Sequence, residues 1–293
     1  MTLAASPIGV FDSGIGGLSV LQALRHELPH EHFVYLADSA HAPYGERGDA
    51  FVQARTQAIA QHMFSTQGIK ALVIACNTAT AAAVEALRAA QPHWPLIGVE
   101  PALKPAAASS QTHHIGVMAT RGTVNSPRFR KLLAQHSGPA QFAVQACDGL
   151  AGAIECSTQT PADGAASPSA IEVLCTRYLD ALGAFGLKTG QMDTLVLGCT
   201  HYIFIKDELR ALVGPDVQLI DTGAPVARQT RRLLAQQGLL QPEGASADAC
   251  PLAPAAHIRL LTTGTLPALQ AAAARWLDLP AHCCAAVDVP LSP

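Results

Sequence analysis

Charged and aromatic residues are scarce in this 293-residue chain, and their scarcity excludes several classes of protein. Charged residues make up 14% of the sequence, against about 25% in typical soluble proteins. Aromatic residues make up 5%, too few for the stacking platforms that hold single-stranded nucleic acid. The net charge is −3, and the longest basic run is Arg231–Arg232. We therefore expect neither nucleic acid nor an anionic membrane surface as a partner.

Long hydrophobic runs and paired cysteines are also missing. Apolar runs such as Leu72–Cys76 are far shorter than the ~20 residues that cross a bilayer. No basic residue precedes Arg25, so the first residues do not resemble a secretion signal. The eight cysteines include no C-x-x-C pair, the spacing typical of metal and redox sites. The sequence thus predicts a cytoplasmic protein with free thiols, no membrane segment and no metal site.

Hydrophobic residues make up 49% of the chain, enough for two cores of ordinary size. Short apolar runs alternate with longer helical patterns over Gly17–Leu28, Asp49–Thr66 and Thr78–Ala90. The short runs predict nine buried strands: Ile8–Phe11, Phe33–Ala37, Ala71–Ala75, Leu96–Val99, Ile115–Met118, Phe142–Gln145, Thr194–Leu197, Val217–Ile220 and Ile258–Leu261. Such alternation is typical of βαβ units, so we predict an α/β protein with parallel sheets.

The two halves of the chain resemble each other weakly. Ile8-Gly9-Val10 matches Ile115-Gly116-Val117, and Leu72–Cys76 matches Leu195–Cys199. The second pair of runs ends in a cysteine in both halves. We therefore predict a duplication: two similar three-layer domains related by pseudo-two-fold symmetry, with the active site in the cleft between them.

The predicted first domain contains residues 1–100 and 212–293, and the second contains residues 101–211. The first would carry Asp12 and Cys76, and the second Cys199 and His201. No regular pattern follows Pro280, so we expect a loosely packed tail. Two stretches rich in small polar residues, Pro and Gly predict exposed loops: 157–169 and 241–256.

Polar clusters follow four of the predicted strands, where open parallel sheets bind their ligands. They are Asp12-Ser13-Gly14, Asp38-Ser39 with Pro43-Tyr44-Gly45, Cys76-Asn77-Thr78 and Cys199-Thr200-His201. The turn Gly14–Gly17 lacks the G-x-G-x-x-G spacing of dinucleotide sites, and Asp12 stands where a pyrophosphate would lie. We expect this turn to present backbone N–H groups to a carboxylate, or to be a purely structural tight turn.

The two strand-ending cysteines are candidates for acid–base chemistry. Cys76 precedes a predicted helix, whose positive end favours a thiolate. Cys199 has His201 two residues further on, which can polarise a thiol. Each cysteine alone has an alternative as a buried structural residue. Together they fit the inversion of a carbon centre, which needs a base on one face and an acid on the other. A cysteine protease or acyltransferase would leave one of the two unexplained.

Five stretches in order resemble the glutamate racemase family of the aspartate/glutamate racemase superfamily. They are IGVFDSGIGGLSV (8–20), YLADSAHAPYG (35–45), IACNTATAAA (74–83), VLGCTHY (196–202) and IDTGAPVA (220–227). The resemblance extends from about residue 8 to 275. It departs from the family pattern at Asp148 and Ile203, where the family usually has proline. It implies an isomerase that needs no cofactor.

The resemblance also implies roles for individual residues. Cys76 would act on the D-enantiomer with help from Asp12, and Cys199 on the L-enantiomer with help from His201. Glu155 falls where the family has a carboxylate near the second cysteine, although it fits a solvated helix position equally well. Substrate-binding positions would be Asp12, Ser13, Tyr44, Gly45, Asn77, Thr78, Thr200 and His201.

The implied activity is interconversion of L- and D-glutamate, which supplies D-glutamate for bacterial peptidoglycan. The partner is then a small molecule, and a homodimer stays open. Aspartate racemase is the nearest alternative, but that group tends to carry an acidic residue where this chain has His201. A non-catalytic, two-lobed amino-acid-binding protein is the alternative of another class, and it has no use for paired thiols.

Overall fold

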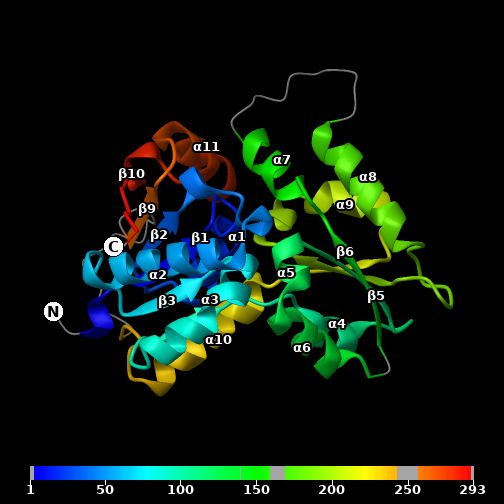
Figure 1. The fold of residues 1–293 in the computed structure, drawn as a ribbon, viewed down its shortest axis with the longest axis horizontal. Helices are drawn as coiled ribbons and strands as arrows, with labels where there is room; N and C mark the ends of the chain where they lie inside the picture. The colour runs from blue at the N-terminus through cyan, green and yellow to red at the C-terminus, as the bar shows by residue number, and fades with distance from the viewer. Residues whose placement is uncertain (1–2, 139, 159–168, 243–256, 292–293) are drawn as a thin grey trace.

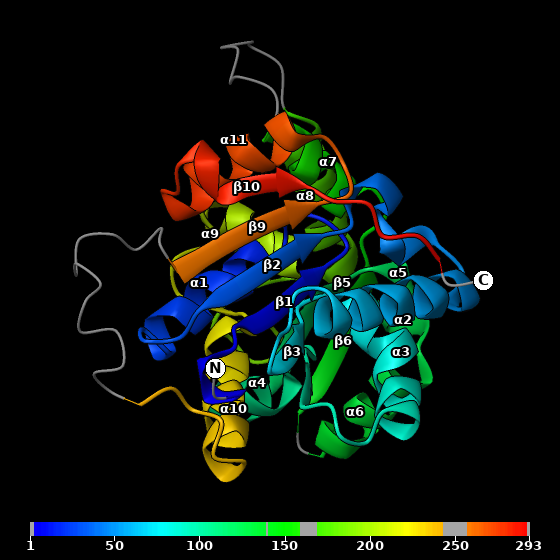
Figure 2. The same ribbon diagram turned by 90° about the vertical axis from the view of Figure 1, so that its left-hand side faces the viewer.

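Two parallel sheets, each covered by helices on both faces, form two lobes that lie side by side (Figures 1 and 2). The computed structural model describes residues 3–138, 140–158, 169–242 and 257–291. Within these ranges no helix is both long and apolar enough to cross a bilayer. The fold class predicted from the sequence, α/β with two parallel-sheet units, is confirmed.

The first lobe is built on a six-stranded sheet with the order β10-β9-β2-β1-β3-β4. Its strands are β1 (Ile8–Asp12), β2 (Phe33–Ala37), β3 (Ala71–Ile74), β4 (Leu96–Gly98), β9 (Ile258–Thr262) and β10 (Cys284–Ala286). One face packs against α1 (Leu18–Glu27), α10 (Gly223–Gln236) and α11 (Leu266–Leu277). The other face packs against α2 (Asp49–Ser65) and α3 (Asn77–Ala90).

The second lobe is built on a four-stranded sheet with the order β6-β5-β7-β8. Its strands are β5 (His114–Ala119), β6 (Gln141–Ala146), β7 (Thr194–Gly198) and β8 (Gln218–Ile220). One face packs against α7 (Leu150–Ser157), α8 (Ala170–Leu182) and α9 (Lys206–Val213), and the other against α4 (Leu103–Ser109) and α6 (Pro127–His136). The short helix α5 (Arg121–Asn125) faces α3 of the first lobe.

Burial on both faces explains why the central strands are continuous apolar runs. In β1, Ile8 and Val10 pack with α1, α10 and α11, whereas Phe11 packs with α2 and α3. A strand with helices on both sides has no solvated face, so alternation with polar residues is not needed. All nine predicted strands are present, and each end lies within one residue of its predicted position.

The strand register confirms the predicted internal repeat. Gly9 pairs with Leu72 in the first sheet, and Gly116 pairs with Leu195 in the second. These are the positions that the sequence match equates. The order β2-β1-β3-β4 is likewise repeated as β6-β5-β7-β8. Equivalent strands β3 and β7 therefore deliver Cys76 and Cys199 to equivalent places.

Two expectations about chain organisation need correction. Strand β8 pairs with β7, so the second sheet extends to Ile220 and the chain returns to the first lobe later than residue 212. The tail is not loosely packed, because β10 extends the first sheet and Cys283, Cys284 and Val289 are buried. The segments predicted as loops, 157–169 and 241–256, lie almost entirely outside the described residues.

Candidate active site

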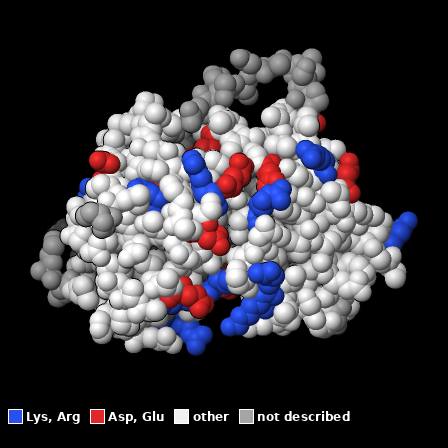
Figure 3. Space-filling model, in the orientation of Figure 1, with Lys and Arg blue, Asp and Glu red and all other residues white. Residues whose placement is uncertain are grey.

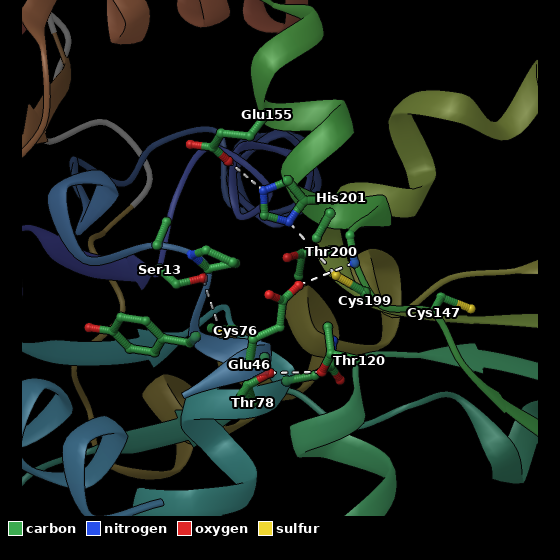
Figure 4. A pocket seen from close by; sticks show the side chains of 18 of the residues that line it. Ser13, Glu46, Cys76, Thr78, Thr120, Cys147, Glu155, Cys199, Thr200 and His201 are labelled. Atoms are coloured by element: carbon green, nitrogen blue, oxygen red, sulfur yellow. Dashed lines mark hydrogen bonds and ion pairs between the residues drawn. The ribbon is translucent and has the colours of Figure 1, made fainter. Parts of the chain in front are cut away.

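A cavity of about 210 Å³ lies between the lobes, where the carboxyl ends of β1 and β3 approach those of β5 and β7 (Figure 4). Its volume is below the ~300–1,000 Å³ of sites for drug-sized ligands, so it suits a molecule the size of one amino acid. Both lobes line it, with Ser13, Tyr44, Gly45, Cys76, Asn77 and Thr78 from the first and Thr120, Cys147, Glu155, Cys199, Thr200 and His201 from the second.

Cys76 lies between β3 and α3 and caps the helix. Its sulfur accepts the N–H of Ala79 at 3.5 Å and lies 3.6 Å from the Ser13 hydroxyl oxygen. Burial and the negative charge of Asp12 raise the pKa of the Cys76 thiol well above its ordinary value. The thiol therefore holds its proton, which suits a proton donor.

Asp12 is fully buried and does not line the cavity. One carboxylate oxygen accepts the N–H groups of Gly14 and Gly17 at 3.3 and 2.9 Å, and the other has no partner among the described residues. Burial raises the pKa of Asp12 to about 6. The expected direct contact of Asp12 with substrate does not match this position, whereas an influence on Cys76 does.

The raised pKa of Asp12 makes its ionisation a cost to the folded state. The folded protein keeps the proton up to about pH 6, while the unfolded chain loses it near 3.8. Below pH 3.8 the carboxyl group is protonated in both states and costs the folded protein nothing. The free energy of unfolding then falls as the pH rises through 6, because the folded state must ionise a buried group. Asp12→Asn, which stays neutral, should therefore raise the free energy of unfolding at pH 7.5 by about 1–3 kcal/mol while lowering activity.

Urea unfolding of the wild type and the Asn variant at pH 4 and pH 7.5 measures this effect. The stability gain should grow between the two pH values. A variant that is no more stable than the wild type at pH 7.5 would contradict a costly buried carboxylate.

Cys199 follows β7 and contacts a histidine that is itself bound to a carboxylate. Its sulfur lies 3.7 Å from Nδ1 of His201, whose Nε2 lies 2.6 Å from a carboxylate oxygen of Glu155. Burial alone would lower the pKa of His201, but its contacts with Cys199 and Glu155 raise it well above the ordinary value. His201 can therefore take a proton from Cys199 and hold it as an imidazolium.

Glu155 lies on α7 of the second lobe but is held by the first. The backbone N–H of Ile15 lies 3.2 and 3.1 Å from its two carboxylate oxygens, and the Ser39 hydroxyl donates at 3.3 Å. Burial alone would raise the pKa of Glu155, but the hydrogen bond and charge of His201, together with the donors Ile15 and Ser39, lower it below its ordinary value. This carboxylate is therefore not a solvated helix residue. The N–H groups of the Gly14–Gly17 turn bind the carboxylates of Asp12 and Glu155, which are side chains of the protein itself.

The predicted substrate-binding residues differ in what they offer a ligand. Both polar atoms of the Asn77 side chain are buried without a partner in the described structure, so they are available. Thr78 shares a hydrogen bond of 2.9 Å with Thr120 across the lobes. The Tyr44 hydroxyl is already committed, because it donates to Asp38 at 2.6 Å. Ser13, Gly45 and Thr200 line the cavity as expected.

Several lining residues were not predicted, among them Thr120, Cys147 and Glu46. Thr120 occupies the position equivalent to Ser13 in the repeat, so the sequence match between the halves could have identified it. Cys147 follows β6, although its side chain points away from Cys199 and His201 (Figure 4). Glu46 accepts the N–H of Gly149 at 3.1 Å across the lobes. No sequence signal indicates this last contact.

The surroundings of the cavity are of mixed charge. On the face shown in Figure 3, most charged side chains lie along the middle, where the lobes meet, with both signs interspersed. At the cavity edge, Arg121 forms an ion pair with Asp148. Among the residues that the structure describes, no group of three or more His, Cys, Asp or Glu is placed to hold a metal ion.

Two similar α/β lobes enclose one cavity, which Cys76 lines from the first lobe and Cys199 from the second. The chain belongs to the Asp/Glu/hydantoin racemase family, whose model matches residues 8–230. The protein is accordingly an isomerase.

Within this family the chain is similar to glutamate racemases. It is 47% identical to the glutamate racemase of Ectopseudomonas mendocina over 247 residues, which are 84% of this chain and 89% of that one. The glutamate racemase structure from Bacillus anthracis superposes with a TM-score of 0.78 and 29% identity, covering 98% and 99% of the two chains. The structure of the Escherichia coli glutamate racemase in complex with L-glutamate and the activator UDP-MurNAc-ala has a TM-score of 0.75 and 31% sequence identity. The match covers 92% of this chain and 95% of that one.

Proposed function

We propose that this protein interconverts L- and D-glutamate without a cofactor, using Cys76 and Cys199 as acid–base groups on opposite faces of Cα. One observation carries the proposal: the two thiols end equivalent strands of two duplicated lobes and line one cavity. Removing and replacing a proton on opposite faces of one carbon needs two such groups facing each other.

In the L-to-D direction, His201 holds the proton of the Cys199 thiol, and the resulting thiolate removes the proton from Cα. The Cys76 thiol, which holds its proton because of burial and the nearby Asp12 charge, then delivers a proton to the opposite face. In the reverse direction Cys76 must first lose its proton. Asp12, whose pKa is about 6, is the nearby group whose charge changes near neutral pH and is suited to assist that loss.

Glutamate is supported as the substrate by the site and by the relatives. The free amide of Asn77 can donate to a carboxylate and accept from an ammonium group. Hydroxyls of Ser13 and Thr200 add donors without a buried fixed cation. The Escherichia coli relative is described in complex with L-glutamate. Its activator contains MurNAc, a peptidoglycan sugar, which agrees with a role for the product D-glutamate in cell-wall synthesis.

Chiral chromatography tests the substrate assignment. The pure protein is incubated with L-glutamate and, separately, with L-aspartate, without added pyridoxal phosphate. Glutamate should approach equal amounts of both enantiomers, and aspartate should remain largely unchanged. Turnover of aspartate alone would assign an aspartate racemase. Binding of glutamate without turnover of either would assign an amino-acid-binding protein.

A further inference from the structure

A buried carboxylate outside the cavity gathers five hydrogen bonds. Asp38, just after β2, is fully buried. It accepts the Tyr44 hydroxyl at 2.6 Å, the Thr263 hydroxyl at 2.9 Å, and Nε and Nη2 of Arg55 at 3.0 and 2.6 Å, and it contacts Nδ1 of His41 at 3.1 Å. So many donors on one carboxylate hold its neighbours in a single arrangement.

Arg55 connects this carboxylate to the C-terminal tail. Its remaining terminal nitrogen, Nη1, donates to the backbone carbonyl of Val289 at 2.7 Å. Arg55 on α2 is 2% exposed and Val289 is 3% exposed, so water does not compete for this bond. The tail reaches Arg55 by running past the end of β9, where the N–H of Val287 donates to the carbonyl of Thr262 at 2.9 Å.

Segment 39–46, which Asp38 holds, is a wall of the cavity. Its residues 42–46 line the cavity together with Ser39. The segment also meets the second lobe at both ends, through Ser39 with Glu155 at 3.3 Å and Glu46 with Gly149 at 3.1 Å. A shift of this wall would therefore change both the shape of the cavity and the contacts between the lobes.

The middle of the wall has little room to move. A Cβ atom on Gly45 would lie 2.7 Å from Cβ of Thr120 in the second lobe. Neither Asp38 nor Arg55 lines the cavity, so their effect on substrate must pass through Tyr44 and the backbone beside it.

We propose that the C-terminal tail is a positioning element of the substrate pocket, acting through Arg55 and Asp38 on the wall formed by segment 39–46. Val289 fixes the guanidinium, the guanidinium fixes Asp38, and Asp38 fixes Tyr44. Asp38 and Arg55 are thus positioning residues. The kinetic part of this proposal rests on the racemase activity proposed above, and the structural part does not.

Two truncations provide a matched test. Ending the chain at Asp288 removes the carbonyl that Arg55 binds, whereas ending it at Pro290 keeps that carbonyl and removes only the last three residues. Loss of a hydrogen bond to a charged group should raise KM for glutamate about tenfold in the shorter protein, with kcat changed less than threefold. The longer protein should match the wild type.

Amide hydrogen exchange gives a readout that needs no turnover. Peptides covering residues 39–46 should exchange faster in the protein that ends at Asp288 than in the one that ends at Pro290. Full-length Arg55→Lys, which keeps the charge but cannot bridge Val289 and Asp38, should reproduce both effects. Combining it with the shorter truncation should add little, because both break the same connection.

Several results would overturn the proposal. The first is a protein ending at Asp288 whose KM and amide exchange match those of the wild type. The second is an equal change of KM and exchange in both truncated proteins. The third is that the effects of the truncation and of Arg55→Lys add when they are combined. If the shorter protein does not fold, Arg55→Lys decides, and unchanged KM and exchange in that variant count against the proposal. If the wild type does not racemise glutamate, the proposed function fails, and the exchange data still test the tail.

Discussion

Replacing either Cys76 or Cys199 by alanine is expected to abolish glutamate racemisation. Loss of a positioned acid–base group typically lowers a rate by about 10²–10⁴. L- and D-glutamate have equal free energies in solution, so kcat/KM must fall by the same factor in both directions. Each variant should therefore show the same loss of kcat/KM whether the reaction starts from L- or from D-glutamate.

Deuterium incorporation tests the two-base mechanism in the wild type. When L-glutamate reacts in D₂O, the early D-glutamate should carry deuterium at Cα, while the remaining L-glutamate stays largely protonated. Cys175→Ala is the control, because Cys175 is buried in the core of the second lobe and does not line the cavity. It should lower stability and leave kcat/KM near the wild-type value. A Cys199→Ala protein that racemises near the wild-type rate would refute paired-thiol catalysis.

Gly16→Ala is expected to lower kcat/KM by about 10²-fold, although Gly16 carries no functional group. A Cβ atom there would lie 2.3 Å from Nδ1 of His201 and 2.6 Å from Oγ1 of Thr200. The backbone of Gly16 does not need a positive φ, so the effect is steric. The methyl group would separate His201 from Cys199, and a displacement of about 1 Å in such a contact costs on the order of 10² in rate.

Gly48→Ala is the matched control, because a Cβ atom at Gly48 meets nothing within 4 Å. Steady-state kinetics and thermal unfolding of both variants separate catalysis from stability. Gly16→Ala should remain folded and lose activity, and Gly48→Ala should retain both. Wild-type kcat/KM in Gly16→Ala would show that the close approach of the lobes at His201 is not needed for the reaction.

Much of the fold follows from patterns within single segments. Buried parallel strands are continuous apolar runs, and the polar residues that follow them mark the carboxyl edge of a sheet. These local signals located nine strands and placed Cys76 and Cys199 at equivalent strand ends. The strand β10 was not predicted, and β8 was predicted as a strand but placed in the wrong lobe, because strand pairing depends on contacts between distant segments.

The sequence by itself determined the α/β class, the internal repeat and the two thiols, because each depends on neighbouring residues or on a match between the halves. Only the tertiary structure decided how distant groups meet. It buried Asp12 outside the cavity, bound the Tyr44 hydroxyl to Asp38, and brought Glu155 to a turn 140 residues away. Such contacts depend on how the two lobes close on each other, and burial then sets the pKa values that the chemistry needs.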